Sequence, residues 1–102
     1  MRTYRVEVDA SAWADIDELT DWIRDNMSRA GGDRYIDAII CEIYTLSVFA
    51  DLYQESRYEA VRRCHPHARR MVSHNRKWAY VFHIESDVVV VDRILKAKLI
   101  TK

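Results

Sequence analysis

The sequence predicts an α+β fold, in which an N-terminal strand and an antiparallel helical hairpin pack on a mainly antiparallel sheet completed by a C-terminal three-strand meander. Three observations predict it. Apolar residues alternate with polar ones over residues 4–9, recur every three or four positions over 11–52, and return to strand-like patterns over 68–95. Because the 102 residues include only two glycines and one proline, we expect residues 1–102 to form a single domain without a linker.

The first predicted strand covers residues 4–9, where every second residue is apolar, which is typical of a strand with one buried face. From Ser11 the apolar period becomes that of a helix, and either Asp9 or Ser11 is a suitable N-terminal cap. The predicted buried stripe of this helix consists of Trp13, Ile16, Leu19, Ile23 and Met27.

A glycine pair is expected to separate this helix from a second one. Gly31 and Gly32 would break the first helix, and Asp33 would cap the next. The second apolar stripe runs to about residue 52 and comprises Ile36, Ile39, Ile40, Ile43, Leu46 and Ala50. Two helices joined by a short glycine turn are expected to pack antiparallel.

The C-terminal half is expected to supply most of the sheet. Residues 53–67 mix aromatic, apolar and charged side chains, which suits either a short strand or a structured loop. Strands are then predicted at 68–73, 78–84 and 88–95, with turns at 74–77 and 85–87. The last strand begins with four valines, so both of its faces are apolar, and we expect it inside the sheet with a covering layer on each side.

The formal net charge of zero conceals a division of charge along the chain. Residues 1–55 hold five basic and twelve acidic groups, a net of −7, whereas residues 56–102 hold eleven basic and four acidic groups, a net of +7. We therefore expect an acidic helical layer beside a basic sheet that also carries all four histidines. The overall balance argues against high affinity for bulk RNA, because phosphate contacts supply much of that affinity.

The sequence shows no targeting signal, and this, together with its use of cysteine, predicts a cytoplasmic protein. The N-terminus has no apolar stretch of signal-peptide type, and no run approaches the ~18 apolar residues that span a bilayer. Cys41 lies in a helical pattern and Cys64 in a polar segment, which suits two free thiols in a reducing compartment. We expect no membrane partner.

Basic residues of the C-terminal half are the main candidates for a binding site. On adjacent strands of a meander they can converge on one surface, where guanidinium groups bind phosphates or carboxylates. The competing interpretation is that they solvate the outer face of the sheet. The series comprises Arg62, Arg63, Arg69, Arg70, Arg76, Lys77, Arg93, Lys96 and Lys98, interleaved with His65, His67, His74, Trp78 and His83.

No metal or cofactor is predicted. Cys64-His65-Pro66-His67 contains zinc-ligand types, but no second ligand pair occurs elsewhere, so we interpret it as a polar loop. Motifs of the GxGxxG, Walker, GxSxG and HExxH types are all missing from the sequence. Trp13, Trp22 and Trp78 are expected to be packing residues.

His83 is a candidate for acid–base work. It should lie on the same strand face as Ala79 and Val81, where a lone histidine is more often a hydrogen-bonded sheet residue than a general base. Its ordinary pKa, about 6.5, suits proton transfer, but the sequence assigns it no carboxylate partner.

The order of these elements resembles the RelE/ParE superfamily of bacterial type II toxins. The resemblance begins with Tyr4-Arg5-Val6-Glu7-Val8 and an alanine- and aspartate-bearing first helix, and it is strongest over residues 78–98 with their Glu85-Ser86-Asp87 turn. It implies a growth-inhibiting toxin of the plasmid-stabilization type, held inactive by a cognate antitoxin, with DNA contacted only through that antitoxin. RelE-like members cleave messenger RNA on the ribosome, whereas ParE-like members inhibit DNA gyrase.

The resemblance also implies site residues. The family's arginine on the second sheet strand matches Arg70, or Arg69 if the register slips, and the arginine of the final strand matches Arg93. Lys96 stands where the ending commonly has histidine, and no tyrosine or histidine follows Lys98. This departure favours the ParE-like branch, for which target or antitoxin contacts would come from Arg69, Arg70, Arg93, Lys96 and Lys98.

Two alternatives remain open from the sequence. A RelE-like ribosome-dependent endoribonuclease would use Arg70 and Arg93 on the scissile phosphate, with His83 or Lys96 assisting proton transfer. The second alternative is an inactive protein that keeps the toxin fold as a partner-binding component.

Overall fold

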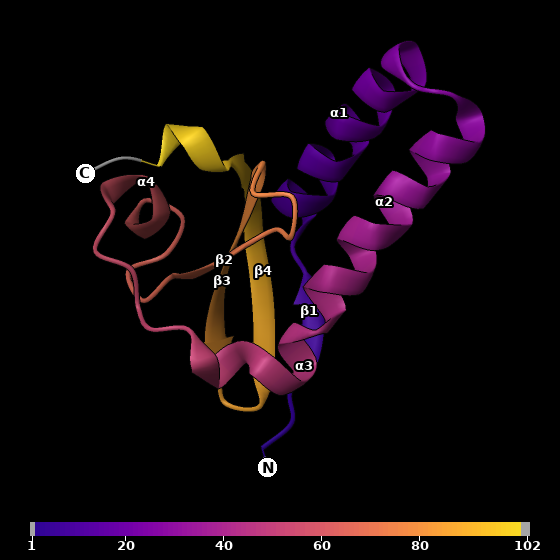
Figure 1. Cartoon of the computed structure of the whole chain (residues 1–102). Coiled ribbons are helices and arrows are strands. Elements are labelled where there is room, and N and C mark those ends of the chain that lie inside the picture. Colours follow the sequence, from indigo (N-terminus) through magenta and orange to yellow (C-terminus); the bar gives the residue numbers. More distant parts are fainter. Residues whose placement is uncertain (1, 101–102) are drawn as a thin grey trace.

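The computed structural model describes residues 2–100 and has the predicted α+β architecture. In Figure 1 a long helical hairpin stands against one side of a sheet, and a short helix lies on the other side. In chain order the elements are β1 (Arg5–Val8), α1 (Ala10–Asn26), α2 (Arg29–Tyr44), α3 (Leu46–Phe49), the 3₁₀ helix η1 (Ala50–Leu52), α4 (Glu59–Arg62), β2 (Arg69–Val72), β3 (Trp78–Glu85), β4 (Val88–Lys96) and the 3₁₀ helix η2 (Ala97–Leu99).

The sheet has the strand order β1-β4-β3-β2. β1 pairs with β4 in parallel, and the two other pairings are antiparallel, so the sheet is mainly antiparallel and ends in the predicted meander. β4 lies between β1 and β3, which confirms its predicted interior position. The turns that connect the meander contain Arg76 and Ser86 in the left-handed region, with φ angles of 63° and 53°.

Hydrophobic cores form on both faces of the sheet. The larger core lies under the hairpin and includes Ile23 and Ile43 of the helices and Phe82 of β3. A smaller core lies on the opposite face, where Val61 of α4 packs with Val81. The sheet is therefore covered on both sides, as the valine run of β4 predicted.

The first helix begins where the sequence indicated, but its buried face differs. Asp9 is the N-cap, and its carboxylate accepts a hydrogen bond from the backbone N–H of Ser11 at 3.0 Å. The buried stripe is formed by Ala12, Ile16, Leu19 and Ile23. Trp13 and Met27, which were predicted to belong to it, are 42% and 38% exposed. The prediction was wrong at these two positions because Ala12, not the bulkier Trp13, faces the sheet.

The predicted glycine turn between the helices is wrong. α1 already ends at Asn26, Ser28 caps α2, and the Ser28 hydroxyl accepts a hydrogen bond from the N–H of Gly31 at 3.1 Å. Gly31 and Gly32 lie inside the first turn of α2, so Asp33 is not a cap. A Cβ at Gly32 would lie 2.6 Å from Cγ2 of Ile23, and this close approach of the two helices explains why glycine occupies a helical position. The antiparallel pairing itself is confirmed (Figure 1).

Between the hairpin and β2 the chain forms three short helical segments. The second long helix stops at Tyr44, and α3 and η1 then carry the apolar stripe on to Leu52, which is itself 74% exposed. Residues 53–67, for which a strand or a loop was predicted, contain the helix α4 and an isolated bridge between Glu55 and Arg69.

Several smaller predictions are decided by the burial pattern. Trp78 packs against the larger core, and its indole N–H donates to the Tyr35 hydroxyl at 2.8 Å, whereas Trp22 is 56% exposed and is not a packing residue. Cys41 and Cys64 are both free thiols, as expected. Within residues 2–100 no helix is at once long and apolar enough to cross a bilayer.

Candidate functional site

The register of the sheet decides which basic side chains share a face. Arg70 of β2 lies opposite Val81 of β3, which in turn lies opposite Arg93 of β4. Because directly opposed residues project from the same face, Arg70 and Arg93 lie on the face that α4 covers. Arg69 lies opposite Phe82 and therefore projects from the hairpin face. The alternative register left open by the sequence is thus excluded, and Arg70 is the arginine that shares a face with Arg93.

The two adjacent arginines of β2 have different surroundings. The guanidinium carbon of Arg70 lies 4.4 Å from the ring centroid of Tyr58, within range of a cation–π interaction, and both side chains line a shallow surface groove. Arg69 instead donates from Nη1 to the carbonyl of Tyr53 at 2.7 Å. None of the ion pairs among residues 2–100 involves Arg70, so its charge is available to a partner.

Arg93 is bound within the protein. Its Nε and Nη2 donate to the two carboxylate oxygens of Asp15 in α1 at 2.7 and 3.0 Å, a bidentate pair. The hydrogen bond to Asp15 holds the pKa of the Arg93 guanidinium above its ordinary value. The pair joins the acidic helix to the basic sheet, and it uses a cation that the sequence had assigned to an external partner.

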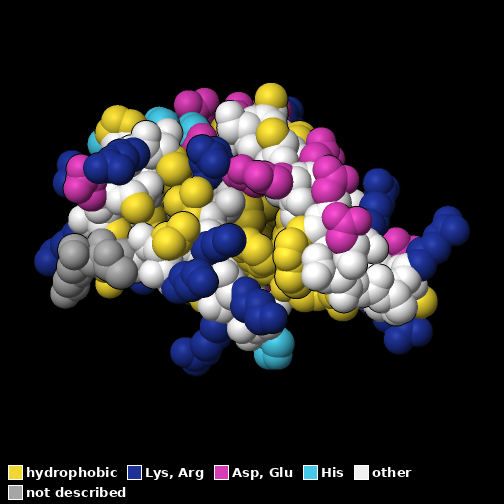
Figure 2. Space-filling view, turned by 90° about the horizontal axis from the view of Figure 1, so that it is seen from above, with side chains coloured by type: hydrophobic (Ala, Val, Ile, Leu, Met, Phe, Trp, Pro, Cys, Tyr) yellow, Lys and Arg dark blue, Asp and Glu magenta, His cyan; other side chains and the backbone are white. Residues whose placement is uncertain are grey.

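The two predicted lysines lie at the end of β4. Lys96 is opposite Trp78, which packs under the hairpin, so Lys96 projects from the hairpin side of the sheet. Lys98 is exposed in η2. Seen from above, Lys and Arg side chains gather beside a hydrophobic hollow next to the hairpin, and many Asp and Glu side chains lie along the helices (Figure 2). The division of charge predicted from the sequence is therefore visible on this side of the molecule.

The predicted basic set is thus divided between the two faces of the sheet. Arg70 and Arg93 share one face, and Arg69 and Lys96 project from the other. Arg69 donates to a carbonyl and Arg93 to a carboxylate, whereas the contact described above for Arg70 is with the Tyr58 ring. Arg69, Arg70, Arg93 and Lys96 therefore do not lie on one face of the sheet, because residues adjacent in a strand point to opposite faces.

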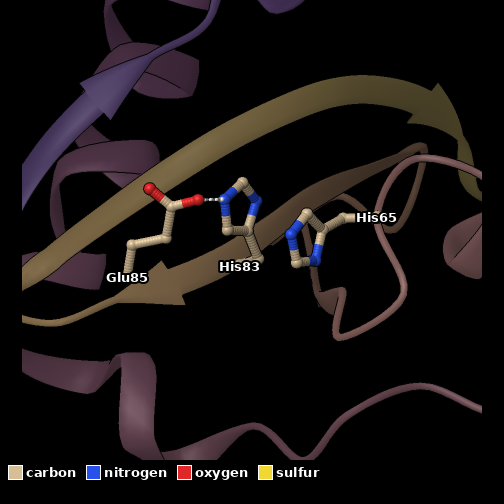
Figure 3. Close-up of side chains that lie close together, drawn as sticks. All are labelled: His65, His83 and Glu85. Carbon is tan, nitrogen blue, oxygen red and sulfur yellow. Dashed lines mark hydrogen bonds and ion pairs between the residues drawn. The ribbon is translucent and has the colours of Figure 1, made fainter.

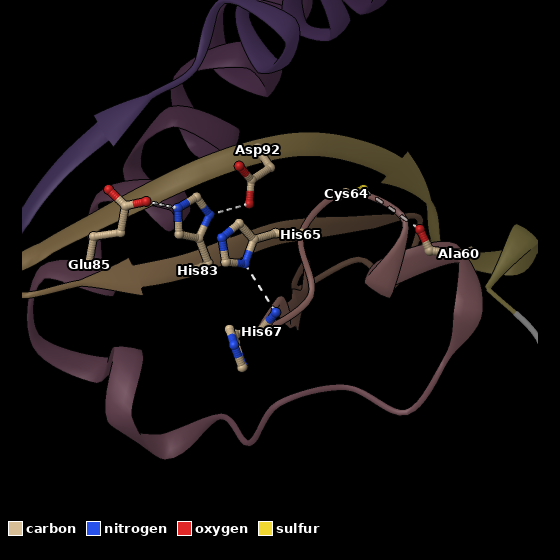
Figure 4. Close-up of polar contacts among 7 residues, drawn as sticks. All are labelled: Ala60, Cys64, His65, His67, His83, Glu85 and Asp92. Carbon is tan, nitrogen blue, oxygen red and sulfur yellow. Dashed lines mark hydrogen bonds and ion pairs between the residues drawn. The ribbon is translucent and has the colours of Figure 1, made fainter.

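His83 lies on the face of Ala79 and Val81, as predicted, and is surrounded by polar groups that the sequence did not assign. Its Nδ1 is 2.7 Å from Oδ2 of Asp92, and its Nε2 is 3.0 Å from Oε1 of Glu85. The imidazole of His65 stacks on it with ring centroids 3.7 Å apart and planes inclined by 3° (Figure 4). The His83 side chain is only 7% exposed.

Asp92 reaches His83 because of an irregularity in the sheet. Val81 pairs with Arg93 and Phe82 pairs with Val91, so Asp92 is the extra residue of a β-bulge in β4. A bulge re-aims a side chain, and here it turns the carboxylate towards the neighbouring strand. An aspartate directly after four valines was the available sequence signal, but its partner depends on a pairing that sequence periodicity does not reveal.

The electrostatics of this cluster favour a proton held between His83 and its carboxylates. Burial disfavours the charged imidazolium, but the hydrogen bonds and negative charges of Asp92 and Glu85 outweigh it, so the pKa of His83 is raised above its ordinary value. Burial also raises the pKa of the Asp92 carboxyl, and the contact with His83 offsets this only in part. His83 is therefore a sheet residue with both ring nitrogens engaged, covered by His65.

The helical hairpin on a four-strand, mainly antiparallel sheet is an architecture shared with other small α+β proteins. Among solved structures, a chain titled "Chromosomal ParDE TA system from P. aeruginosa" superimposes with a TM-score of 0.77 at 15% identity, and the match covers 92% of this chain and 96% of that one. At this identity the likeness establishes the fold. The comparison with curated proteins gave no match.

The family follows from the sequence itself. A family model described as the ParE toxin of the type II toxin-antitoxin system, parDE, matches residues 6–99, which is nearly the whole chain. The chain belongs to this ParE toxin family. The resemblance to the RelE/ParE superfamily drawn from the sequence is thereby confirmed, together with the preference for its ParE-like branch.

Proposed function

We propose that this toxin inhibits DNA gyrase and is neutralised by a cognate antitoxin that binds it directly. The observation that carries the proposal is the match to the ParE toxin family over residues 6–99. The proposal places the protein in the cytoplasm, where gyrase acts, and leaves contact with DNA to the antitoxin.

The distribution of the basic and histidine side chains supports a protein target over RNA cleavage. A ribonuclease gathers cations and a proton-transfer group around one phosphate. Here Arg93 is paired with Asp15, and Lys96 projects from the opposite face to Arg70. His83 lies beneath His65 with a carboxylate at each ring nitrogen. Of the four candidates for a nuclease site, Lys96 lies on the other face of the sheet, and Arg93 and His83 are already engaged by carboxylates.

Exposed apolar side chains support binding of a protein partner. Tyr44, Phe49 and Leu52, which follow one another from the end of α2 to η1, are 46%, 46% and 74% exposed. Contiguous apolar patches on a small protein are typical of interaction surfaces, and these three residues are candidates for one. The acidic residues of an antitoxin tail would complement the basic side chains seen in Figure 2, and its apolar residues would complement exposed apolar side chains such as these.

A gyrase supercoiling assay tests the proposed target. The purified chain, added in increasing amounts to gyrase and relaxed plasmid, is expected to block supercoiling. Arg70→Ala should weaken the block at least tenfold, whereas the matched control Arg34→Ala, which removes an exposed arginine from α2, should not. Unchanged supercoiling at saturating toxin would overturn the proposal, and transcript cleavage during translation would then identify the ribonuclease alternative.

Co-expression with the protein encoded by the adjacent gene tests the antitoxin. The two chains are expected to co-purify, and the pair is expected to leave gyrase activity unchanged. If induction of the chain alone is harmless to cells and gyrase is unaffected, the chain is an inactive member of the family.

A further inference from the structure

Three side chains of the types that bind metal ions come together on the sheet face away from the hairpin. His65 comes from the segment between α4 and β2, and His83 and Glu85 come from the end of β3 (Figure 3). One ligand atom of each residue lies within 4.8 Å of the ligand atoms of the other two. We propose that His65, His83 and Glu85 bind a divalent transition-metal ion of the Zn²⁺ type.

The spacing of His83 and Glu85 already suits a tetrahedral ion. Nε2 of His83 and Oε1 of Glu85 are 3.0 Å apart. Two ligands at 2.0–2.1 Å from a tetrahedral zinc ion are separated by about 3.3 Å. An ion can therefore replace the proton between these two atoms with a movement of a few tenths of an ångström.

Asp92 prepares His83 for this role. Its carboxylate accepts the Nδ1–H of His83 at 2.7 Å, which leaves the lone pair of Nε2 as the metal-binding position. A carboxylate behind a histidine ligand fixes the tautomer and ring orientation in the same way at many zinc sites. The Asp92 side chain is 14% exposed and the His83 side chain 7%, so this pair is held by the surrounding sheet.

His65 is the ligand that must move. Its ring lies parallel to that of His83, and lone pairs of two parallel rings do not converge on one ion. Rotation out of the stack breaks the 3.0 Å hydrogen bond that Nδ1 of His65 accepts from the N–H of His67 (Figure 4). His65 lies in a partly exposed loop segment, where such a rotation meets little packing. The ion would then tie this segment to β3.

The donor set indicates which ions bind. Two imidazole nitrogens and one carboxylate oxygen suit Zn²⁺, Co²⁺ and Ni²⁺ better than Mg²⁺ or Ca²⁺, which prefer oxygen ligands. Cys64 does not take part, because its thiol contacts the carbonyl of Ala60 at 3.6 Å, within its own helical turn. Solvent would complete the coordination.

Calorimetric titration of the tag-free, EDTA-treated chain with ZnCl₂ tests the site, and it does not depend on toxin activity. One ion is expected to bind per chain with a dissociation constant in the micromolar range. His65→Ala and Glu85→Gln should each weaken binding at least tenfold. Both residues are partly or fully exposed, so the variants are expected to fold, which circular dichroism checks, and buried His83 is left intact.

Matched controls separate this site from adventitious binding. His74→Ala removes an exposed histidine from the turn between β2 and β3, and Cys64→Ser removes the nearest thiol; both should bind Zn²⁺ within twofold of the parent chain. The Co²⁺ complex should show tetrahedral visible bands without thiolate charge transfer. The proposal is overturned if no ion binds at 100 µM ZnCl₂ (roughly a hundredfold above a micromolar constant), or if His74→Ala or Cys64→Ser lowers the affinity as much as His65→Ala does.

Discussion

Arg93 of β4 and Asp15 of α1, 78 positions apart in the chain, form a bidentate ion pair with nitrogen–oxygen distances of 2.7 and 3.0 Å. The same Asp15 carboxylate accepts the backbone N–H of Ile94 at 2.9 Å. The pairing of β1 with β4 ends at Val91. Beyond that point, the Asp15 carboxylate binds the edge of β4 that β1 no longer covers. The Asp15 side chain is 13% exposed and the Arg93 side chain 45%. The hydrogen bond from the Ile94 N–H to Asp15 is therefore better shielded from solvent than the ion pair with Arg93.

The first prediction concerns this pair. Asp15→Ala should lower the free energy of unfolding by about 1–3 kcal/mol, because it leaves the N–H of Ile94 without its acceptor. Asp15→Asn keeps an acceptor oxygen and loses only the ion pair, so it should cost no more than about 1 kcal/mol. Arg93→Ala should lower the free energy of unfolding by a similar amount to Asp15→Asn, because it too removes only the ion pair. Urea unfolding of the three variants measures the differences, and equal losses for alanine and asparagine at position 15 would contradict the assigned role of the backbone contact.

The second prediction concerns the crossing of α1 and α2. Gly32→Ala should destabilise the protein by about 1–3 kcal/mol, although alanine is the better helix former, because its Cβ would lie 2.6 Å from Ile23. Gly31→Ala is the matched control, since its Cβ would meet the Ser28 hydroxyl at 3.0 Å and Cε of Met27 at 3.8 Å, both in the connection between the helices. In thermal unfolding, Gly32→Ala should have a lower melting temperature than Gly31→Ala. A Gly32→Ala variant as stable as the parent chain would show that the hairpin can open at this point without loss.

The third prediction separates cations that bind a partner from those that hold the fold. Lys96 and Lys98 are exposed, so their double alanine variant should unfold like the parent chain but associate more slowly with the antitoxin, with a weaker dependence on salt. Arg93→Ala should show the reverse, with lower stability and an association rate within twofold of the parent value. Surface plasmon resonance at two salt concentrations measures the rates. A loss of association rate in Arg93→Ala equal to that of the double variant would assign Arg93 to the interface.

Local patterns in the sequence were sufficient for the order and type of the main elements. The alternation around Val6 and the helical period around Ile16 each reflect an element that buries one face, and the valine run from Val88 reflects a strand that is covered on both. The strands were therefore placed to within one residue. The glycine pair misled the prediction because glycine costs a helix only about 1 kcal/mol. The close packing of α2 against Ile23, which leaves no room for a Cβ at Gly32, outweighs that penalty.

The site was less predictable because it depends on pairings between segments. Arg70 and Arg93 share a face through the register of three strands, and neither residue carries that information in its own surroundings. The neutralisation of Arg93 needs Asp15 from the other end of the chain. The His83 cluster in turn needs a bulge at Asp92, and one additional residue in a strand leaves almost no trace in a periodic pattern.

The fourth prediction concerns the two thiols. Burial raises the pKa of Cys64, which is half-buried beside α4, whereas Cys41 is exposed on α2. Because the thiolate is the reactive form, iodoacetamide at pH 7.5 should label Cys41 several-fold faster than Cys64. Raising the pH to 9.5 should narrow the ratio of the two labelling rates, since more of the Cys64 thiol is then ionised.

Mass spectrometry of the Cys41→Ser and Cys64→Ser variants gives each labelling rate separately. In 8 M urea, where burial is lost, the two rates should become equal. A Cys64 that reacts as fast as Cys41 in the folded protein would mean that the segment around α4 opens readily in solution.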